Sequence, residues 1–141
     1  MLLLPSSKRM LAEVVDSSCK AAVKFVNTYY DFLDNKRNLL PKLYGDNAVM
    51  LWNGNPFQGS PSITEFLTSF PDSKHKILSF DAQPILQGNV LLQVSGSVSY
   101  PTSQQQDERQ PKAFSQSFIL LPAPGGALNH SIIASDTFRF V

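Results

Sequence analysis

The spacing of apolar residues changes along this chain, and that change constrains the fold more than any other feature. From about Lys8 to Asn35 apolar residues recur at every third or fourth position, which predicts one long amphipathic helix. From Asp72 onward apolar and polar residues alternate over four segments, which predicts strands. Helices followed by a run of strands indicate an α+β fold, with an antiparallel sheet packed over the long helix. The apolar stripe of that helix consists of Leu11, Val14, Val15, Ala22, Val23, Val26, Tyr29, Tyr30 and Leu33.

A short helix and a hairpin are predicted after the long helix. The short helix covers Asn38 to Tyr44 and is ended by Gly45, and Pro41 within it removes a backbone donor and distorts it. A strand from Asn47 to Trp52 follows, and Asn53-Gly54-Asn55-Pro56 forms the turn into a short strand near Phe57. On the residues alone, this turn beside the tryptophan could frame a pocket or serve only as a turn.

A third helix is predicted after the hairpin. Ser60 would cap it and Pro61 would take its first position. Alternatively, a capping box formed by Ser62 and Glu65 would begin the helix two residues later. Its buried face is predicted to contain Ile63, Phe66, Leu67 and Phe70. The strands that follow are predicted near residues 75–86, 89–100, 113–121 and 130–141.

Length and composition exclude several classes of protein. The 141 residues indicate a single domain, 1–141, and the lone Cys19 allows no internal disulfide, which favours a reducing compartment. The net charge is +1 with scattered basic residues, so direct nucleic-acid binding is not expected. The opening residues lack the features of a signal peptide, and no apolar stretch is long enough for a membrane span.

Alternation along the strands divides the side chains between two faces of the sheet. The face predicted to pack on the helices contains Leu78, Phe80, Ala82, Val90, Leu92, Val94, Val98, Tyr100, Phe114, Phe118, Leu120, Phe138 and Phe140, with Gln116 as its main polar member. The opposite face contains Ile77, Ser79, Asp81, Gln83, Ile85, Leu91, Gln93, Ser95, Ser97, Ser99, Ser115, Ser117, Ile119, Ser135, Thr137, Arg139 and Val141. This second face is small and polar with few charges, which favours a protein interface over a solvated surface.

Ordered motifs give the chain a family resemblance over about residues 19–141. They are Phe25-Val26-Asn27-x-Tyr29-Tyr30, Trp52-Asn53-Gly54-Asn55, Asp81-x-Gln83-Pro84, Phe114-x-Gln116-x-Phe118-x-Leu120 and Ile133-Ala134-Ser135-Asp136-x-Phe138-Arg139-Phe140. Together they resemble the nuclear transport factor 2 fold, and in particular its mRNA-export branch. Residues 1–18 lie outside the clear resemblance.

The resemblance implies a cone-like, strongly curved antiparallel sheet over one long and two short helices. It implies a small, non-catalytic subunit that pairs with the corresponding domain of the large mRNA export receptor and needs no cofactor. It further implies shuttling between nucleus and cytoplasm, presence at the nuclear pore, contact with nucleoporin repeats through the heterodimer, and weak homodimers when the partner is missing. The predicted partner-binding residues are Asp81, Gln83, Leu91, Gln93, Ser95, Ser117, Ile119, Ser135, Thr137 and Arg139. Among them, Asp81 resembles an acid that pairs with an arginine of the large subunit.

Two other functions within this fold remain as alternatives. A homodimeric carrier of Ran-GDP is disfavoured, because Asn53 stands where the Ran-binding members have an acidic residue. A small-molecule isomerase or dehydratase is disfavoured, because no acid is expected to point into the apolar cone and both His75 and His130 are expected to be exposed. No nucleophile–base set, paired carboxylates or metal-ligand spacing is recognisable in the sequence.

Overall fold

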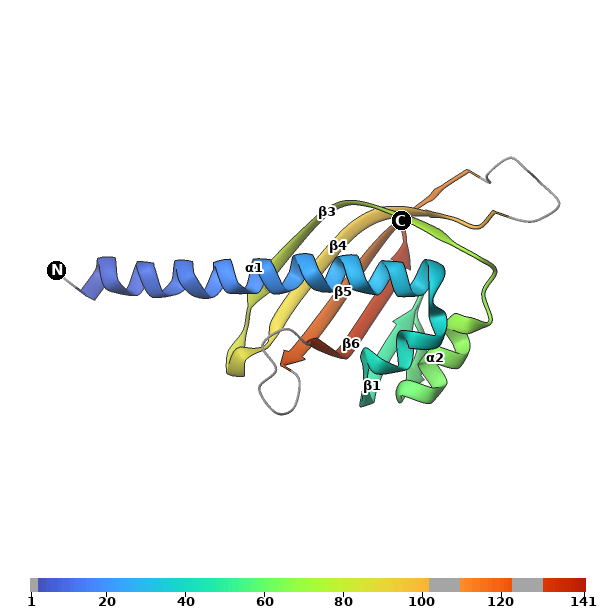
Figure 1. Cartoon of the computed structure of the whole chain (residues 1–141), viewed down its shortest axis with the longest axis horizontal. Helices are drawn as coiled ribbons and strands as arrows, with labels where there is room; N and C mark the ends of the chain where they lie inside the picture. Colours follow the sequence, from blue (N-terminus) through green and yellow to red (C-terminus); the bar gives the residue numbers. More distant parts are fainter. Residues whose placement is uncertain (1–2, 102–109, 123–130) are drawn as a thin grey trace.

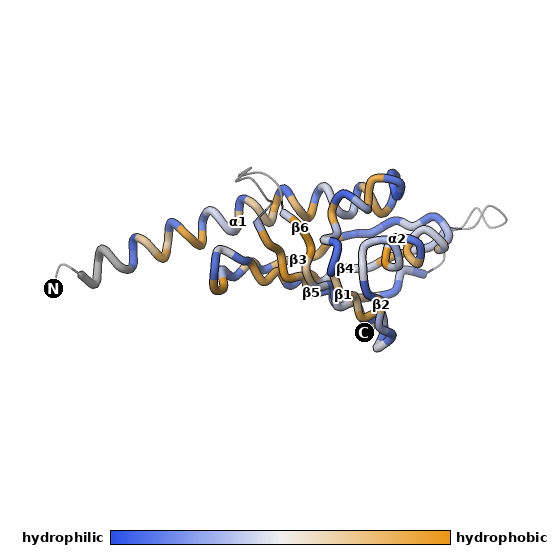
Figure 2. Tube along the Cα trace, turned by 90° about the horizontal axis from the view of Figure 1, so that it is seen from below, coloured by the Kyte–Doolittle hydropathy of each residue, from blue (hydrophilic) through white to orange (hydrophobic). Residues whose placement is uncertain are grey.

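The computed structural model describes residues 3–101, 110–122 and 131–141, without the side chains of residues 3–7. One long helix crosses one face of a six-stranded sheet, and the helix and the sheet form separate layers (Figures 1 and 2). The elements in chain order are α1 (Leu3–Asn35), η1 (Arg37–Lys42), β1 (Tyr44–Trp52), β2 (Asn55–Gln58), α2 (Ser60–Thr68), β3 (Lys74–Pro84), η2 (Leu86–Gly88), β4 (Val90–Ser99), β5 (Lys112–Pro122) and β6 (Ser131–Phe140).

The strand order in the sheet is β2-β1-β6-β5-β4-β3. The last four strands form the predicted antiparallel meander, and the α+β fold class is confirmed. The sheet differs from the expected cone in two respects. Strand β1 pairs with β6 in parallel, so the sheet is mixed, and it is not strongly curled. The parallel pair joins strands far apart in sequence, which no local spacing of apolar residues could indicate.

The stripe predicted for α1 packs on the sheet over the C-terminal half of the helix. The predicted members that are buried there are Ala22, Val26, Tyr29, Tyr30 and Leu33. Val23 was predicted in the stripe but is 48% exposed, and Phe25 is buried although the prediction omitted it. The helix begins at Leu3, earlier than predicted, and ends at Asn35 as expected.

The two short helices differ from prediction at their ends. Element η1 is a 3-10 helix that contains Pro41, but Tyr44 and Gly45 belong to β1 and do not end the helix. Helix α2 is preceded by Gly59 at φ 88°, and the Ser60 hydroxyl does not cap it. A positive φ favours glycine. The residue that precedes α2 is therefore Gly59, one position before the serine that was predicted as the cap.

The tryptophan of the hairpin is a core residue, which decides between the two readings of this turn. Trp52 stacks on Phe138 with ring centroids 3.9 Å apart and meets Phe70 edge to face. Asn53 and Gly54 both have positive φ, at 48° and 85°, as a tight hairpin turn requires. The turn is therefore structural, and it closes the core instead of framing a pocket.

The register of β3 contains a bulge that reverses part of its predicted face pattern. Ile77, predicted outward, packs against the core, while Leu78, predicted inward, is 67% exposed. The pairing with β4 shifts between Ile77 and Ser79, so Leu78 is the extra residue. Beyond the bulge, Phe80 faces inward and Asp81 outward as predicted.

The bulge is packed against Gly96 of β4, a position with no room for a side chain. A Cβ there would collide with the Lys76 carbonyl oxygen and would lie 3.2 Å from Cζ of Phe114. We expect Gly96→Ala to lower the free energy of unfolding by ~1–3 kcal/mol, the usual cost of overpacking a core. Urea unfolding checks this against Ser95→Ala, an exposed neighbour that should have little effect. An unchanged midpoint for Gly96→Ala would mean that β3 can move away from β4.

Candidate functional site

The outer face of the sheet, which is turned away from α1, carries the predicted partner-binding residues in cross-strand rows. The rows are Asp81–Gln93–Ser117–Thr137, Gln83–Leu91–Ile119–Ser135, and Ser79–Ser95–Ser115–Arg139. Every residue predicted for partner binding therefore lies on this one face. The rows are contiguous because, beyond the bulge of β3, the strand register places outward-pointing residues of neighbouring strands side by side.

Exposed aliphatic side chains extend this face onto β1 and the bulge. Val49 and Leu51 are 42% and 39% exposed, and they pair with Ser135 and Thr137 of β6. Leu78 joins the same face through the bulge. The sequence prediction missed these residues, although the alternation of β1, with Met50 and Trp52 inward, could have revealed Val49 and Leu51.

The polar residues at the centre of the face are hydrogen-bonded to one another. Gln93 Nε2 donates to Ser115 Oγ at 2.7 Å, and the Ser117 hydroxyl donates to Gln93 Oε1. The amide of Gln93 is thus fixed between two serines of the neighbouring strand. A face whose polar groups satisfy one another can be covered by a partner at a low desolvation cost.

The charged residues of the face are separated from each other. Asp81 is on β3 and Arg139 is on β6, with β4 and β5 between them. Three strand spacings of ~4.8 Å put them ~14 Å apart, so Arg139 cannot neutralise Asp81 within this chain. Neither side chain forms an ion pair with any residue that the structure describes, and both are exposed. Two charges of opposite sign therefore remain available to a partner.

A buried carboxylate lies on the opposite, inner face. Asp136 is 1% exposed, and its Oδ2 accepts a hydrogen bond from the hydroxyl of Tyr44 at 2.7 Å. The Tyr29 hydroxyl lies 2.7 Å from the Tyr44 hydroxyl, its shorter contact, and 3.5 Å from Oδ2. Oδ1 of Asp136 accepts a bond from Nε2 of Gln116 at 2.8 Å. Tyr30 donates in turn to Oε1 of Gln116 at 2.7 Å. The expectation that no acid points into the core is wrong. Asp136 lies two residues before Phe138 on β6, so both side chains point to the inner face of the sheet.

Burial dominates the ionisation of this cluster. It raises the pKa of Asp136 to about 6, against the opposing effect of the hydrogen bonds from Gln116, Tyr44 and Tyr29. Burial, followed by the nearby Asp136 charge, raises the pKa of Tyr44 well above its usual value. Both oxygens of Asp136 accept hydrogen bonds from neighbouring side chains. The cluster ties α1, β1, β5 and β6 together.

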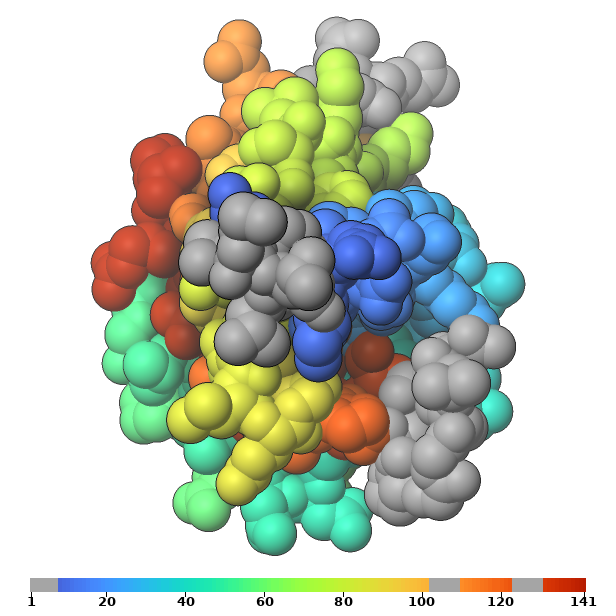
Figure 3. Space-filling model, turned by 90° about the vertical axis from the view of Figure 1, so that its left-hand side faces the viewer, coloured from blue at the N-terminus to red at the C-terminus, as the bar shows by residue number. Residues whose placement is uncertain are grey.

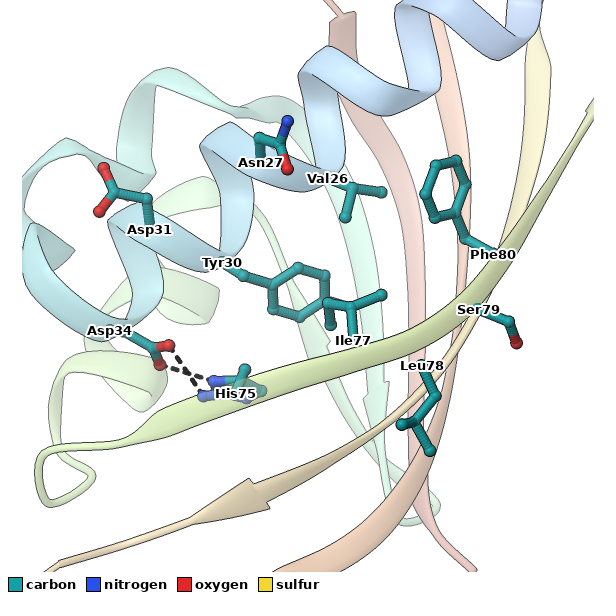
Figure 4. A pocket seen from close by; sticks show the side chains of 10 residues that line it. All are labelled: Val26, Asn27, Tyr30, Asp31, Asp34, His75, Ile77, Leu78, Ser79 and Phe80. Carbon is teal, nitrogen blue, oxygen red and sulfur yellow. Dashed lines mark hydrogen bonds and ion pairs between the residues drawn. The ribbon is translucent and has the colours of Figure 1, made fainter.

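A second acid, Asp34, holds the end of α1 to the start of β3 (Figure 4). Its carboxylate accepts hydrogen bonds from the backbone N–H of His75 at 2.8 Å and from Ser73 Oγ at 2.7 Å, and its Oδ1 lies 2.6 Å from His75 Nδ1. Burial acts to raise the pKa of Asp34, but the bonds from His75 and Ser73 outweigh it and the pKa is lowered. The expected exposure of His75 is wrong, since its side chain is 2% exposed, and His130 lies outside the described residues.

The groove beside this pair has Asp34 and His75 themselves among its lining residues. It has a volume of about 580 Å³ between α1 and β3, and Val26, Tyr30, Ile77 and Phe80 line its apolar part. The Tyr30 hydroxyl is turned to Gln116 and not to the groove. Over the described ranges, no histidine, cysteine and carboxylate side chains gather as a metal site would require. Within the same ranges, none of the helices combines the length and apolar character needed to cross a bilayer.

The chain is similar to nuclear transport proteins over most of its length. Residues 21–140 match the nuclear transport factor 2 (NTF2) domain. NTF2-related export protein 1 of Bos taurus is 37% identical over 132 residues, which cover 89% of this chain and 90% of that protein. NTF2-related export protein 2 of Homo sapiens is 35% identical over 134 residues, 89% of each chain. The NTF2-related export protein of Caenorhabditis elegans is 35% identical and covers 87% of this chain and 88% of its own.

Solved structures share the same fold. Nuclear transport factor 2 of Cryptosporidium parvum superposes with a TM-score of 0.75 at 29% identity, over 88% of this chain and 94% of that one. The Chaetomium thermophilum Mex67 NTF2-like domain complexed with Mtr2 gives a TM-score of 0.72 at 21% identity, over 89% and 99%. The domain match over residues 21–140 and the 37% and 35% identity to the export proteins show the family. This chain therefore belongs to the nuclear transport factor 2 family.

Proposed function

We propose that this chain is the non-catalytic small subunit of a heterodimeric nuclear mRNA export receptor. Its outer sheet face would cover the matching face of an NTF2-like domain in the large subunit and so stabilise that domain. The relatives named as export proteins support this role, as does the Mex67 NTF2-like domain, which was solved in complex with Mtr2. Shuttling through nuclear pores, with nucleoporin repeats contacted through the heterodimer, is part of the same proposal.

The observation that carries the proposal is the composition of the outer sheet face. Exposed Val49, Leu51 and Leu78 surround a polar centre whose groups bond one another, and the charges Asp81 and Arg139 are unpaired among the described residues. A mixture of aliphatic and satisfied polar groups with few charges is typical of the centre of a protein interface. A sheet face exposed to solvent alone would be expected to carry many lysines and glutamates.

An isomerase is the alternative that the buried Asp136 favours, since acids of this kind act as bases or donors in such enzymes. Here the carboxylate is closed in by Tyr29, Tyr44 and Gln116, and a substrate could reach it only by displacing these donors. A carboxylate without access to a substrate atom cannot transfer its proton. We therefore assign Asp136 a role in stability.

Co-expression with the large receptor subunit of the source organism tests the assembly. We expect a one-to-one heterodimer, because a single outer face supports one partner, and only weak self-association of the chain alone. Size-exclusion chromatography with light scattering measures both states. A chain that stays strictly monomeric at high concentration and does not bind the receptor domain would contradict the proposed function.

A further inference from the structure

Strand β3 forms one edge of the sheet, and its free side faces the groove between β3 and α1. The strand order ends at β3, which pairs only with β4. The lining residues of the groove all come from α1 and β3. In Figure 3, which views the molecule from the N-terminal end of α1, the yellow-green atoms of β3 lie beside the blue atoms of the helix. Within the part of the chain that the structure describes, no further strand pairs with this edge.

The groove follows the edge of β3 and not one of its faces. Four consecutive residues of the strand, 77–80, line it, although their side chains belong to both faces of the sheet. Figure 4 has Ile77 and Phe80 turned towards α1 and Leu78 turned away from it. Side chains of opposite direction can border the same groove only where it runs beside the backbone that carries them. The groove therefore exposes the backbone of the edge strand.

The backbone groups on this side of β3 have no strand to bind. The N–H of His75 points away from β4, because it donates to Oδ2 of Asp34 on α1. Backbone groups alternate in direction along a strand, so those of Ile77 point the same way. The extra residue Leu78 shifts the alternation by one position, which makes Phe80 the next such residue. Toward the described residues on this side, neither Ile77 nor Phe80 forms a backbone hydrogen bond. Free groups of this kind are those that bind an added strand.

Charge and apolar character differ between the two ends of the groove. Asp31 and Asp34 line one end, and none of the lining residues is a lysine or arginine. The Asp31 side chain is 44% exposed, and its pair with the exposed Lys36 at 3.4 Å is of the kind that contributes little. Val26 and Phe80 line the other end. A ligand complementary to this groove has a cation near Asp31 and an apolar group near Val26.

We propose that the groove binds an extended peptide segment of a partner protein, which adds to β3 as a further strand and carries a lysine or arginine two residues from an apolar residue. The spacing follows from the helix and the strand. Val26 and Asp31 lie ~7.5 Å apart along the helix axis, and two residues of a strand span ~6.8 Å. Strand addition to an exposed edge is an established mode of peptide recognition. Because the outer sheet face is turned away from α1, this site does not depend on the heterodimer.

A short fluorescent peptide tests the site in an anisotropy titration of the full chain. Its centre is Lys-Thr-Leu between serines and threonines, and it is made in both sequence directions because the groove does not fix the direction of the strand. We expect Asp31→Lys to weaken binding of the tighter peptide at least ~10-fold, which corresponds to ~1.4 kcal/mol. The matched control is Asp16→Lys, an exposed acid of the same helix that pairs with Lys20, and it should bind like the wild type.

Methylation of the peptide nitrogens distinguishes an added strand from binding by side chains alone. An added strand donates every second N–H to β3, so methylation of one alternate set should abolish binding. Methylation of the other set should leave binding unchanged, because those N–H groups point away from β3. The amides of Ile77 and Phe80 should become protected from hydrogen exchange when the unmethylated peptide is added.

Three results would overturn the inference. If the chain binds neither sequence direction, the edge of β3 is not a peptide site. If both methylated sets bind like the parent peptide, the groove holds the lysine and leucine side chains without an added strand, as it would hold a small organic cation. If Asp81→Lys weakens binding and Asp31→Lys does not, the peptide lies on the outer sheet face instead.

Discussion

Replacing Asp136 with asparagine is expected to remove a pH dependence of ~3 kcal/mol from the free energy of unfolding, since the pKa of this buried acid is raised from 3.8 to about 6 and each unit is worth ~1.4 kcal/mol. The folded state holds the proton more tightly than the unfolded state does. The stabilising contribution of the neutral acid is therefore complete below about pH 4 and is lost as the pH rises through about 6. The wild-type chain should become less stable over this window.

Urea unfolding at a series of pH values measures this effect as the difference between the two proteins. Asparagine keeps an oxygen that can accept the bond from Gln116, and its amide can donate to the Tyr44 hydroxyl, so the cluster stays satisfied. The difference should shift in favour of Asp136→Asn by ~3 kcal/mol between pH 4 and pH 7. Taking the difference cancels the titration of Asp34 and the other acids, which both proteins share.

The matched control is Thr137→Asn, the same new side chain at the neighbouring exposed position. It should unfold with the pH profile of the wild type, because Thr137 points away from the cluster. A wild-type chain whose stability rises between pH 4 and pH 6 relative to Asp136→Asn would mean that Asp136 is ionised at low pH in the folded state. The three donors would then outweigh burial.

Local spacing was sufficient to predict every element except η2, and most of the two sheet faces. Alternation holds over most of β4, over β5 and over β6 from Ser135 onward, so the inward positions of Val94, Phe118 and Phe138 could be read from the sequence. In β6 the register against β5 shifts at Ala134, between Ile133 and Ser135. The same rule fails at Ile77 and Leu78, where one extra residue reverses the faces. A bulge leaves little trace in the spacing of apolar residues. Gly96 opposite Ile77 is the one available signal, because glycine within a strand often marks a close approach.

The buried polar cluster could be predicted only in part. The alternation of side chains along β5 and β6 places Gln116 and Asp136 on the inner face. Their burial could therefore be predicted from the sequence. Their partners Tyr29 and Tyr44 come from α1 and β1, and the parallel pairing of β1 with β6 that brings Tyr44 near Asp136 is a long-range contact. The pairing of His75 with Asp34 is likewise set by the packing of β3 against α1. Side-chain contacts of this kind depend on the assembled fold and have no local pattern.

The last prediction is a loss of heterodimer affinity when Asp81 is replaced. Asp81 lies exposed on the outer face between Gln83 and Ser79, without an ion-pair partner among the described residues. Truncating one member of a charge pair buried in an interface costs ~2–5 kcal/mol, much of it from the charge left without a partner. We therefore expect Asp81→Ala to weaken binding of the receptor domain by at least ~30-fold, at ~1.4 kcal/mol per tenfold.

Reversing the charge should cost more than removing it, because Asp81→Lys would face a cation of the partner directly. Titration calorimetry against the receptor domain measures both variants, with Asp72→Ala as a matched control at an exposed acid outside the sheet. Arg139→Ala distinguishes an Asp81 that pairs with a cation of the partner from an Asp81 that Arg139 neutralises within this chain. Since Arg139 lies across β4 and β5 from Asp81, it cannot supply the missing charge, and its removal should cost less than Asp81→Lys. Wild-type affinity for Asp81→Ala would show that the partner does not cover this row, and the outer face would then need another occupant.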